Sequence, residues 1–140
     1  MAAVYVGYTN CPDVCPTTMA DLAVAVRSLT EQQRADVDVI MVTSDPDRDT
    51  PTRMRQWLDA FDRSFVGLTG AYADVQQAAT EMGIPIEPPV TQPDGTVVVD
   101  HGAQVLLYGR TGPARLIFTS GFTPSAVAHD IALLLEGTQP

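Results

Sequence analysis

The pattern of hydrophobic and polar positions divides the chain into strand-like and helix-like segments that alternate. Residues 3–8 (AVYVGY) and residues 36–45 (DVDVIMVTSD) are rich in β-branched and aromatic types, which favours strands. The second run is almost continuous, so it predicts a strand that is covered on both faces. Residues 64–68 (SFVGL) predict a short third strand.

Hydrophobic residues between and after these strands recur every three or four positions, which predicts amphipathic helices. Pro16 suits the first position of the first helix, because a helix offers no partner for an N–H there. Thr50 and Thr123 are expected to cap two later helices at their N-termini. Gly83 and Gly137 are expected where two helices end. The positions that share a helical face are Met19, Leu22, Val26 and Leu29; Met54, Trp57, Leu58 and Phe61; Val75, Ala79 and Met82; and Val127, Ile131, Leu134 and Leu135.

The later part of the chain predicts a long loop followed by a hairpin. Residues 84–95 carry four prolines, which remove backbone donors and predict a loop without regular structure. Residues 103–108 and 114–118 flank a Gly-Arg-Thr-Gly turn and predict an antiparallel pair. The order β-α-β-α-β-α-β-β-α indicates the α/β class, as a thioredoxin-like sandwich. We expect one such domain over residues 1–140, with a mixed sheet, helices on both faces and a late antiparallel hairpin.

Composition and charge exclude some classes of function. The chain of 140 residues has a net charge of -9, and its eight basic residues are all arginines that form no stripe along the sequence. Such a chain offers little to nucleic-acid phosphates, so nucleic acid is excluded as a partner, and the acidity indicates a solvated surface. No apolar stretch approaches the roughly 18 residues of a membrane span, and residues 1–10 lack a signal-peptide pattern.

Both cysteines of the chain lie in the segment YTNCPDVCP, between the first predicted strand and the first predicted helix. Two cysteines are too few for a disulfide-stapled scaffold, so Cys11 and Cys15 indicate redox or metal chemistry. The start of a helix is expected to stabilise their thiolates. The three-residue spacer is expected to leave both sulfur atoms facing outward, which suits a metal. Two thiolates favour copper or zinc over hard cations.

Two histidines could complete such a site. His129 follows the core position Val127 by two residues on the last helix, so we expect it on the surface. His101 is expected to open the first strand of the hairpin, beside the strand that leads to the cysteines. His101 is therefore the better candidate ligand, and Asp100 could orient its ring.

The residues alone leave other chemistry open. The two thiols could form a thiol–disulfide oxidoreductase that closes a disulfide after attacking its substrate. A structural zinc site would need a fourth ligand, for which Asp13 or Asp100 is available. The three aspartates of residues 45–49 could be read as a hard-cation site. A proline and an arginine interrupt them, however, and a capped loop is the simpler interpretation.

Three ordered motifs resemble those of the Sco/SenC family, and the resemblance spans essentially all 140 residues. Residues 7–19 (GYTNCPDVCPTTM) are similar to the family's Thr-x-Cys-Pro-Asp-x-Cys-Pro signature. Residues 43–51 (TSDPDRDTP) are similar to its Asp-Pro-x-Arg-Asp-Thr-Pro segment, and residues 99–107 (VDHGAQVLL) to its Val-Asp-His block.

The resemblance implies a thioredoxin-fold protein that binds copper, as Cu(I), Cu(II) or both, through Cys11, Cys15 and His101. It implies a metallochaperone rather than an enzyme, which delivers copper to, or prepares, the copper A centre of cytochrome c oxidase. The partner would be the oxidase subunit with that centre or another copper protein. The protein would act as a monomer at the extracytoplasmic face of the bacterial cytoplasmic membrane. The alternative is an oxidoreductase that uses Cys11 and Cys15 to reduce the acceptor's cysteines.

The sequence departs from the family pattern beside the candidate histidine. Gly102 replaces the usual Ser or Thr, Leu106 replaces an aromatic residue, and Gly109-Arg110 replaces Asp-Pro or Gly-Pro in the turn. These changes are expected to affect the choice of partner more than the binding of copper. Family members also begin with a membrane anchor and a first hairpin, and we expect the single domain of this chain to lack both.

Overall fold

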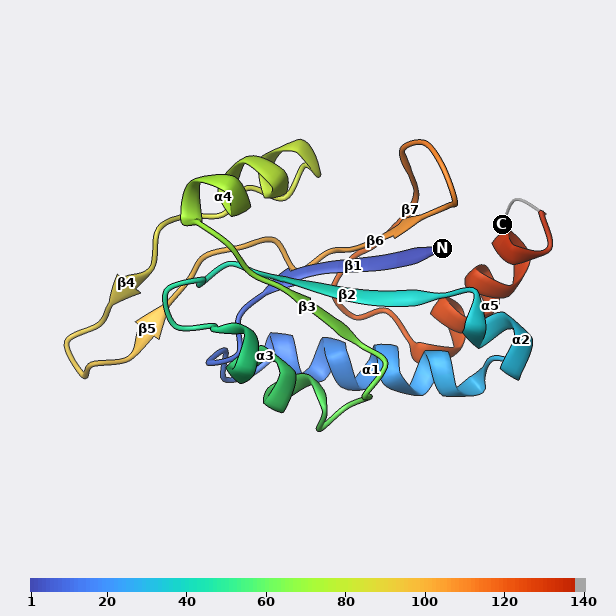
Figure 1. Ribbon diagram of the computed structural model, residues 1–140, viewed down its shortest axis with the longest axis horizontal. Helices are drawn as coiled ribbons and strands as arrows, with labels where there is room; N and C mark the ends of the chain where they lie inside the picture. The colour runs from blue at the N-terminus through green and yellow to red at the C-terminus, as the bar shows by residue number, and fades with distance from the viewer. Residues whose placement is uncertain (138–140) are drawn as a thin grey trace.

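A five-stranded mixed sheet forms the centre of the computed structural model, which describes residues 1–137 (Figure 1). The last three residues of the predicted domain lie outside the described residues. The strands of this sheet lie in the order β3-β2-β1-β6-β7. Their bounds are β1 Ala2–Gly7, β2 Asp38–Thr43, β3 Val66–Leu68, β6 Val105–Tyr108 and β7 Ala114–Phe118.

Strand β1 occupies the middle of the sheet, and the pairing around it is mixed as predicted. β1 pairs with β2 in parallel, and β2 pairs with β3 in parallel. On its other side β1 pairs with β6 antiparallel, and β6 pairs with β7 as the predicted late hairpin. This order places the segment before β6 next to the carboxyl end of β1, where the cysteine motif begins.

Helices cover both faces of the sheet, as predicted, but they cover them unequally (Figure 1). Helices α1 (Val14–Ser28), α3 (Pro51–Leu58) and α5 (Pro124–Leu135) contribute buried side chains to the main core on one face. Helix α4 (Tyr72–Glu81) packs on the opposite face with a smaller core. Within the described residues, no helix is both long enough and apolar enough to cross a membrane.

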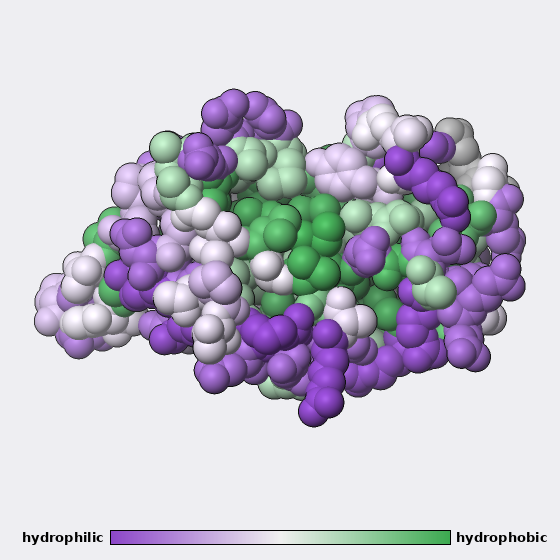
Figure 2. Space-filling model, viewed as in Figure 1, coloured by the Kyte–Doolittle hydropathy of each residue, from purple (hydrophilic) through white to green (hydrophobic). Residues whose placement is uncertain are grey.

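The prediction that residues 36–45 form a strand covered on both faces is wrong for one face. Val39 and Met41 are buried against the helices of the main core, whereas Ile40 and Val42 are only half-buried. The neighbouring strand β3 leaves Val66 39% exposed on the same face. Figure 2 shows the resulting hydrophobic patch between α4 and the β6–β7 hairpin. A single helix is too narrow to cover all strands of this face.

One helix boundary and two short elements differ from the sequence-based predictions. Helix α1 begins at Val14 and not at Pro16, so Cys15 belongs to its first turn. A short helix, α2 (Glu31–Ala35), was not predicted, although Thr30 and Gln33 form a capping box at its start. The loop predicted for residues 84–95 is partly regular, because β4 (Val90–Thr91) pairs with β5 (Val97–Val98) in a two-stranded sheet.

Candidate metal centre

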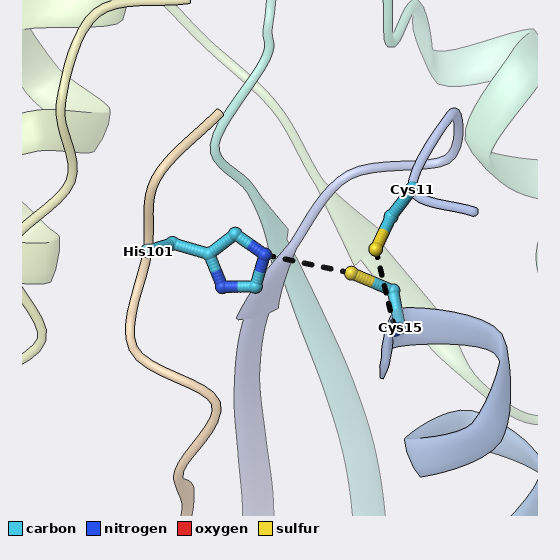
Figure 3. A group of neighbouring side chains, drawn as sticks. All are labelled: Cys11, Cys15 and His101. Carbon is cyan, nitrogen blue, oxygen red and sulfur yellow. Dashed lines mark hydrogen bonds between the residues drawn. The ribbon is translucent and has the colours of Figure 1, made fainter. Parts of the chain in front are cut away.

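The two cysteines lie where β1 feeds into α1 (Figure 3). Cys11 belongs to the connecting loop and is half-buried, whereas Cys15 in the first turn of α1 is completely buried. The backbone N–H of Cys15 donates a hydrogen bond to Cys11 Sγ at 3.4 Å. Both thiols are free. The expectation that both sulfur atoms face outward is therefore wrong for Cys15, because the helix turns its side chain into the core.

His101 reaches the cysteines from the connection between β5 and β6 (Figure 3). It does not open β6, as the sequence predicted, but forms an isolated antiparallel bridge with Ile86. Its Nε2 lies 3.6 Å from Cys15 Sγ, and its Nδ1 lies 3.0 Å from the carbonyl oxygen of Gly102. The Gly102 carbonyl therefore orients the ring, and not the side chain of Asp100, which is exposed.

The structure brings together the three side chains that the sequence singled out. One ligand atom each from Cys11, Cys15 and His101 lies within 4.8 Å of the other two. In residues 1–137 this is the one group of three or more Cys, His, Asp or Glu side chains that could hold a metal ion. His129 is exposed on α5, as expected, and does not belong to the group.

Burial determines the protonation of the inner thiol. Burial raises the pKa of Cys15 to about 12, and the hydrogen bond that Tyr5 donates lowers it only in part. The expected stabilisation of the Cys15 thiolate by the helix start is thus outweighed by desolvation. Cys15 is a neutral thiol at neutral pH, so a metal ion that binds it must displace a proton.

Two tyrosines that the sequence analysis missed surround the site. Tyr5 and Tyr8 are buried, and each forms a T-shaped contact with the ring of His101, with centroid distances of 6.1 Å and 5.7 Å. The hydroxyl of Tyr5 also donates a hydrogen bond to Cys15 Sγ at 3.3 Å. Burial raises the pKa of Tyr5 far above its ordinary value, so its hydroxyl keeps its proton. The alternation of inward and outward side chains along β1 places Tyr5 on the side of the main core, and this was the one sequence signal that could have located it near the site.

A buried carboxylate fixes the loop between β1 and Cys11. Asp49 is 1% exposed, and it accepts hydrogen bonds from the backbone N–H and the hydroxyl of Thr9, at 3.0 Å and 2.5 Å. The hydroxyl of Thr43, at the end of β2, donates to the same carboxylate at 2.7 Å. Arg53 adds a hydrogen bond to the Thr9 hydroxyl at 2.8 Å. This network ties the start of the cysteine loop to β2 and α3.

The aspartate-rich segment 45–49 is a capped loop, in agreement with the simpler interpretation of its sequence. Asp45 forms a two-pronged ion pair with Arg48, at 2.6 Å and 2.8 Å, and Thr50 caps α3. Asp45 and Asp49 are buried, whereas Asp47 is exposed. The three side chains therefore do not converge on one point as ligands of a hard cation would.

The histidine side of the site opens into a groove of about 300 Å³. The groove lies beside the ring of His101, and it is lined by Pro85, Glu87, Asp100, His101, Gly102 and Gln104. A ligand atom from another molecule can therefore approach the imidazole, whereas the sulfur of Cys15 is reached only past its neighbours.

The donor set fits a soft metal ion. Two sulfur atoms and one imidazole nitrogen match the preference of copper and zinc, and the carboxylates of the neighbourhood are paired elsewhere or exposed. Fold and site together define a thioredoxin-like α/β protein with a Cys-Cys-His group that could hold a metal ion, at the junction of β1 and α1. The chain belongs to the SCO1/SenC family, whose model matches residues 1–136.

Curated relatives of the chain include mitochondrial proteins. The chain is 31% identical to the protein SCO1 of Saccharomyces cerevisiae over 99 residues, which are 70% of this chain and 34% of that protein. It is 29% identical to the SCO1 homolog 1 of Arabidopsis thaliana over 133 residues, or 95% of this chain and 37% of that protein. The chain thus spans about a third of the length of these two relatives.

Solved structures of the family share the fold. The copper-bound ScoI of Bradyrhizobium japonicum superposes with a TM-score of 0.83 at 32% identity, over 94% of this chain and 82% of that chain. The copper-bound Sco1 of yeast gives a TM-score of 0.86 at 25% identity, over 99% of this chain and 77% of that chain. The predicted thioredoxin-like sandwich is thereby confirmed.

Proposed function

We propose that the protein binds one copper ion through the thiolates of Cys11 and Cys15 and the imidazole of His101. The observation that carries this proposal is the approach of the three donor atoms to within 4.8 Å, from positions as far apart as residues 11 and 101. Membership of a family whose solved structures include copper-bound proteins supports the choice of copper over zinc. Zinc in a structural site would want a fourth protein ligand.

The protein acts as a metallochaperone in this proposal, and it breaks no bond in a substrate. Copper passes to an acceptor by exchange of one ligand for another at the half-exposed side of the site, where Cys11 and His101 lie. By family resemblance, the acceptor is the copper A centre of cytochrome c oxidase. By the same resemblance, the protein works at the extracytoplasmic face of the bacterial cytoplasmic membrane.

Replacement of His101 tests the proposal. His101→Ala removes one of three donors, and we expect the affinity for copper to fall by at least about 100-fold. His129→Ala is the matched control, because His129 is exposed on α5 away from the site, and its affinity should stay unchanged. Both affinities are measured by competition with a copper chelator. An unchanged affinity in His101→Ala would remove the imidazole from the proposed site.

The closeness of the two thiols also supports a second candidate, a thiol–disulfide oxidoreductase that reduces the acceptor's cysteines. The sulfur atoms of Cys11 and Cys15 lie within 4.8 Å of each other, and a disulfide of about 2.05 Å needs only a small rearrangement of the loop. The two functions compete, because an oxidised pair cannot ligate copper. Catalytic turnover with a disulfide substrate, at a rate that copper suppresses, would favour the enzyme.

A further inference from the structure

Tyr5 contacts two of the three candidate ligands. It lies within β1, completely buried, and its hydroxyl donates a hydrogen bond to Cys15 Sγ at 3.3 Å. Its ring and the ring of His101 form a T-shaped contact at an interplanar angle of 85°. Because a strand in the middle of the sheet holds Tyr5, the hydroxyl has little freedom to turn away from the sulfur.

The neighbouring Gly7 keeps space for this contact. A Cβ atom on Gly7 would lie 2.6 Å from Cε1 of Tyr5 and 3.0 Å from Cys15 Sγ. Both distances are shorter than ordinary van der Waals contacts, so any larger residue at position 7 would push the phenol and the sulfur apart. The backbone of β1 is thus adapted to bring one phenol against one thiol.

The direction of the hydrogen bond is fixed once the sulfur binds a metal. A metal-bound thiolate has no hydrogen, so it can only accept, and the phenol of Tyr5 must donate. Hydrogen bonds to a charged acceptor are about twice as strong as those between neutral groups. The interaction therefore withdraws electron density from the sulfur that would otherwise be given to the metal.

We propose that Tyr5 is a positioning residue that biases the copper site toward Cu(I) by donating a hydrogen bond to Cys15 Sγ. This inference rests on the proposed copper-binding function. A thiolate stabilises Cu(II) by donating electron density, and a donor to the sulfur weakens that donation. The binding of Cu(II) is weakened more than the binding of Cu(I), because the Cu(II)–thiolate bond depends more strongly on that electron density.

Tyr5→Phe removes the hydroxyl and keeps the ring that contacts His101. Tyr108→Phe is the matched control, because it also removes one phenol hydroxyl, but from a tyrosine that packs against the smaller core on the opposite face of the sheet. Each protein is loaded with one equivalent of copper. Three quantities are measured: copper content, the wavelength of the thiolate-to-Cu(II) charge-transfer band, and the Cu(II)/Cu(I) reduction potential.

We expect Tyr5→Phe to bind one copper as the wild type does, with a charge-transfer band at longer wavelength. Its preference for Cu(I) over Cu(II) should fall by about tenfold, which is about 59 mV in reduction potential, while Tyr108→Phe leaves both values unchanged. An unaltered band and potential in Tyr5→Phe would overturn the inference and leave the proposed function intact. Complete loss of copper from Tyr5→Phe would also overturn it, since the hydroxyl would then hold the site together rather than tune it. A wild-type protein that takes up no copper would overturn the proposed function, and the inference with it.

Discussion

The carboxylate of Asp49 holds the loop that leads to Cys11, and its removal has an effect that can be worked out from the structure. Asp49 is buried and accepts three hydrogen bonds, two from Thr9 and one from Thr43. Asp49→Ala removes the acceptor oxygens of all three hydrogen bonds at once. Because Thr9 precedes Cys11 by two residues, the same change frees the start of the cysteine loop.

The size of the loss follows from the donors that Asp49→Ala leaves behind. A hydrogen bond to a charged group contributes about 1.5–3 kcal/mol. Two of the three donors are hydroxyls that can turn to other acceptors, but the backbone N–H of Thr9 cannot. Removal of a buried charge also relieves its desolvation, which offsets part of the loss. We expect the free energy of unfolding to fall by about 2–4 kcal/mol, out of about 5–15 kcal/mol for a typical domain.

Urea unfolding of the reduced, metal-free protein, followed by far-UV circular dichroism, measures this loss. Asp47→Ala is the control, because Asp47 is exposed in the same loop and should change the free energy of unfolding by less than about 0.5 kcal/mol. Asp49→Asn keeps the shape and one acceptor oxygen, so its loss should fall between the two. A loss below about 0.5 kcal/mol for Asp49→Ala would refute the reasoning, since the network would then contribute nothing to stability.

Three further predictions concern the packing and the protonation of the site. Gly7→Ala should lower the free energy of unfolding by about 1–3 kcal/mol, because the new Cβ meets the rigid ring of Tyr5 at 2.6 Å. Gly102→Ala should also lower the free energy of unfolding by about 1–3 kcal/mol in the same urea assay, because the new Cβ meets the buried Oε1 of Gln104 and lies 3.0 Å from Cγ2 of the buried Ile84. The affinity for Cu(I) should rise by at least about tenfold per pH unit between about pH 7 and pH 9, because the pKa of Cys15 is raised to about 12 and its proton competes with the metal. Chelator competition at several pH values checks this, and a flat profile would contradict a protonated Cys15.

The elements with strong periodicity could be predicted from the sequence. The hydrophobic spacing of α1 identified four residues that are all buried, and the caps Thr50 and Thr123 stand where they were expected. Helix α2 was missed because it has no buried residue, so no hydrophobic pattern marks it. Strands β4 and β5 were missed because each has two residues, too few for an alternation to be visible.

The candidate ligands could be named from the sequence, but their surroundings could not. The spacing of Cys11 and Cys15 indicates metal or redox chemistry whether the thiols are buried or exposed. The burial of Cys15 depends on where α1 begins. Successive side chains of a helix point in directions about 100° apart, so the start of α1 at Val14 rather than Pro16 determines the direction of the Cys15 side chain. The carbonyl of Gly102 as the partner of His101, and the contact from Tyr5 to Cys15, join segments that are distant in the chain. No local pattern records such contacts.

The unequal burial of the three donor groups determines the order in which ligands can exchange under the proposed function. Cys15 is completely buried and receives a hydrogen bond from Tyr5, so an incoming ligand cannot reach behind it. Cys11 and His101 are half-buried, and a groove runs beside His101. An acceptor must therefore replace Cys11 or His101 first and Cys15 last. Because the buried thiolate of Cys15 keeps its bond to copper until ligands of the acceptor have bound, copper can pass from this protein to the acceptor without being released into water as a free ion.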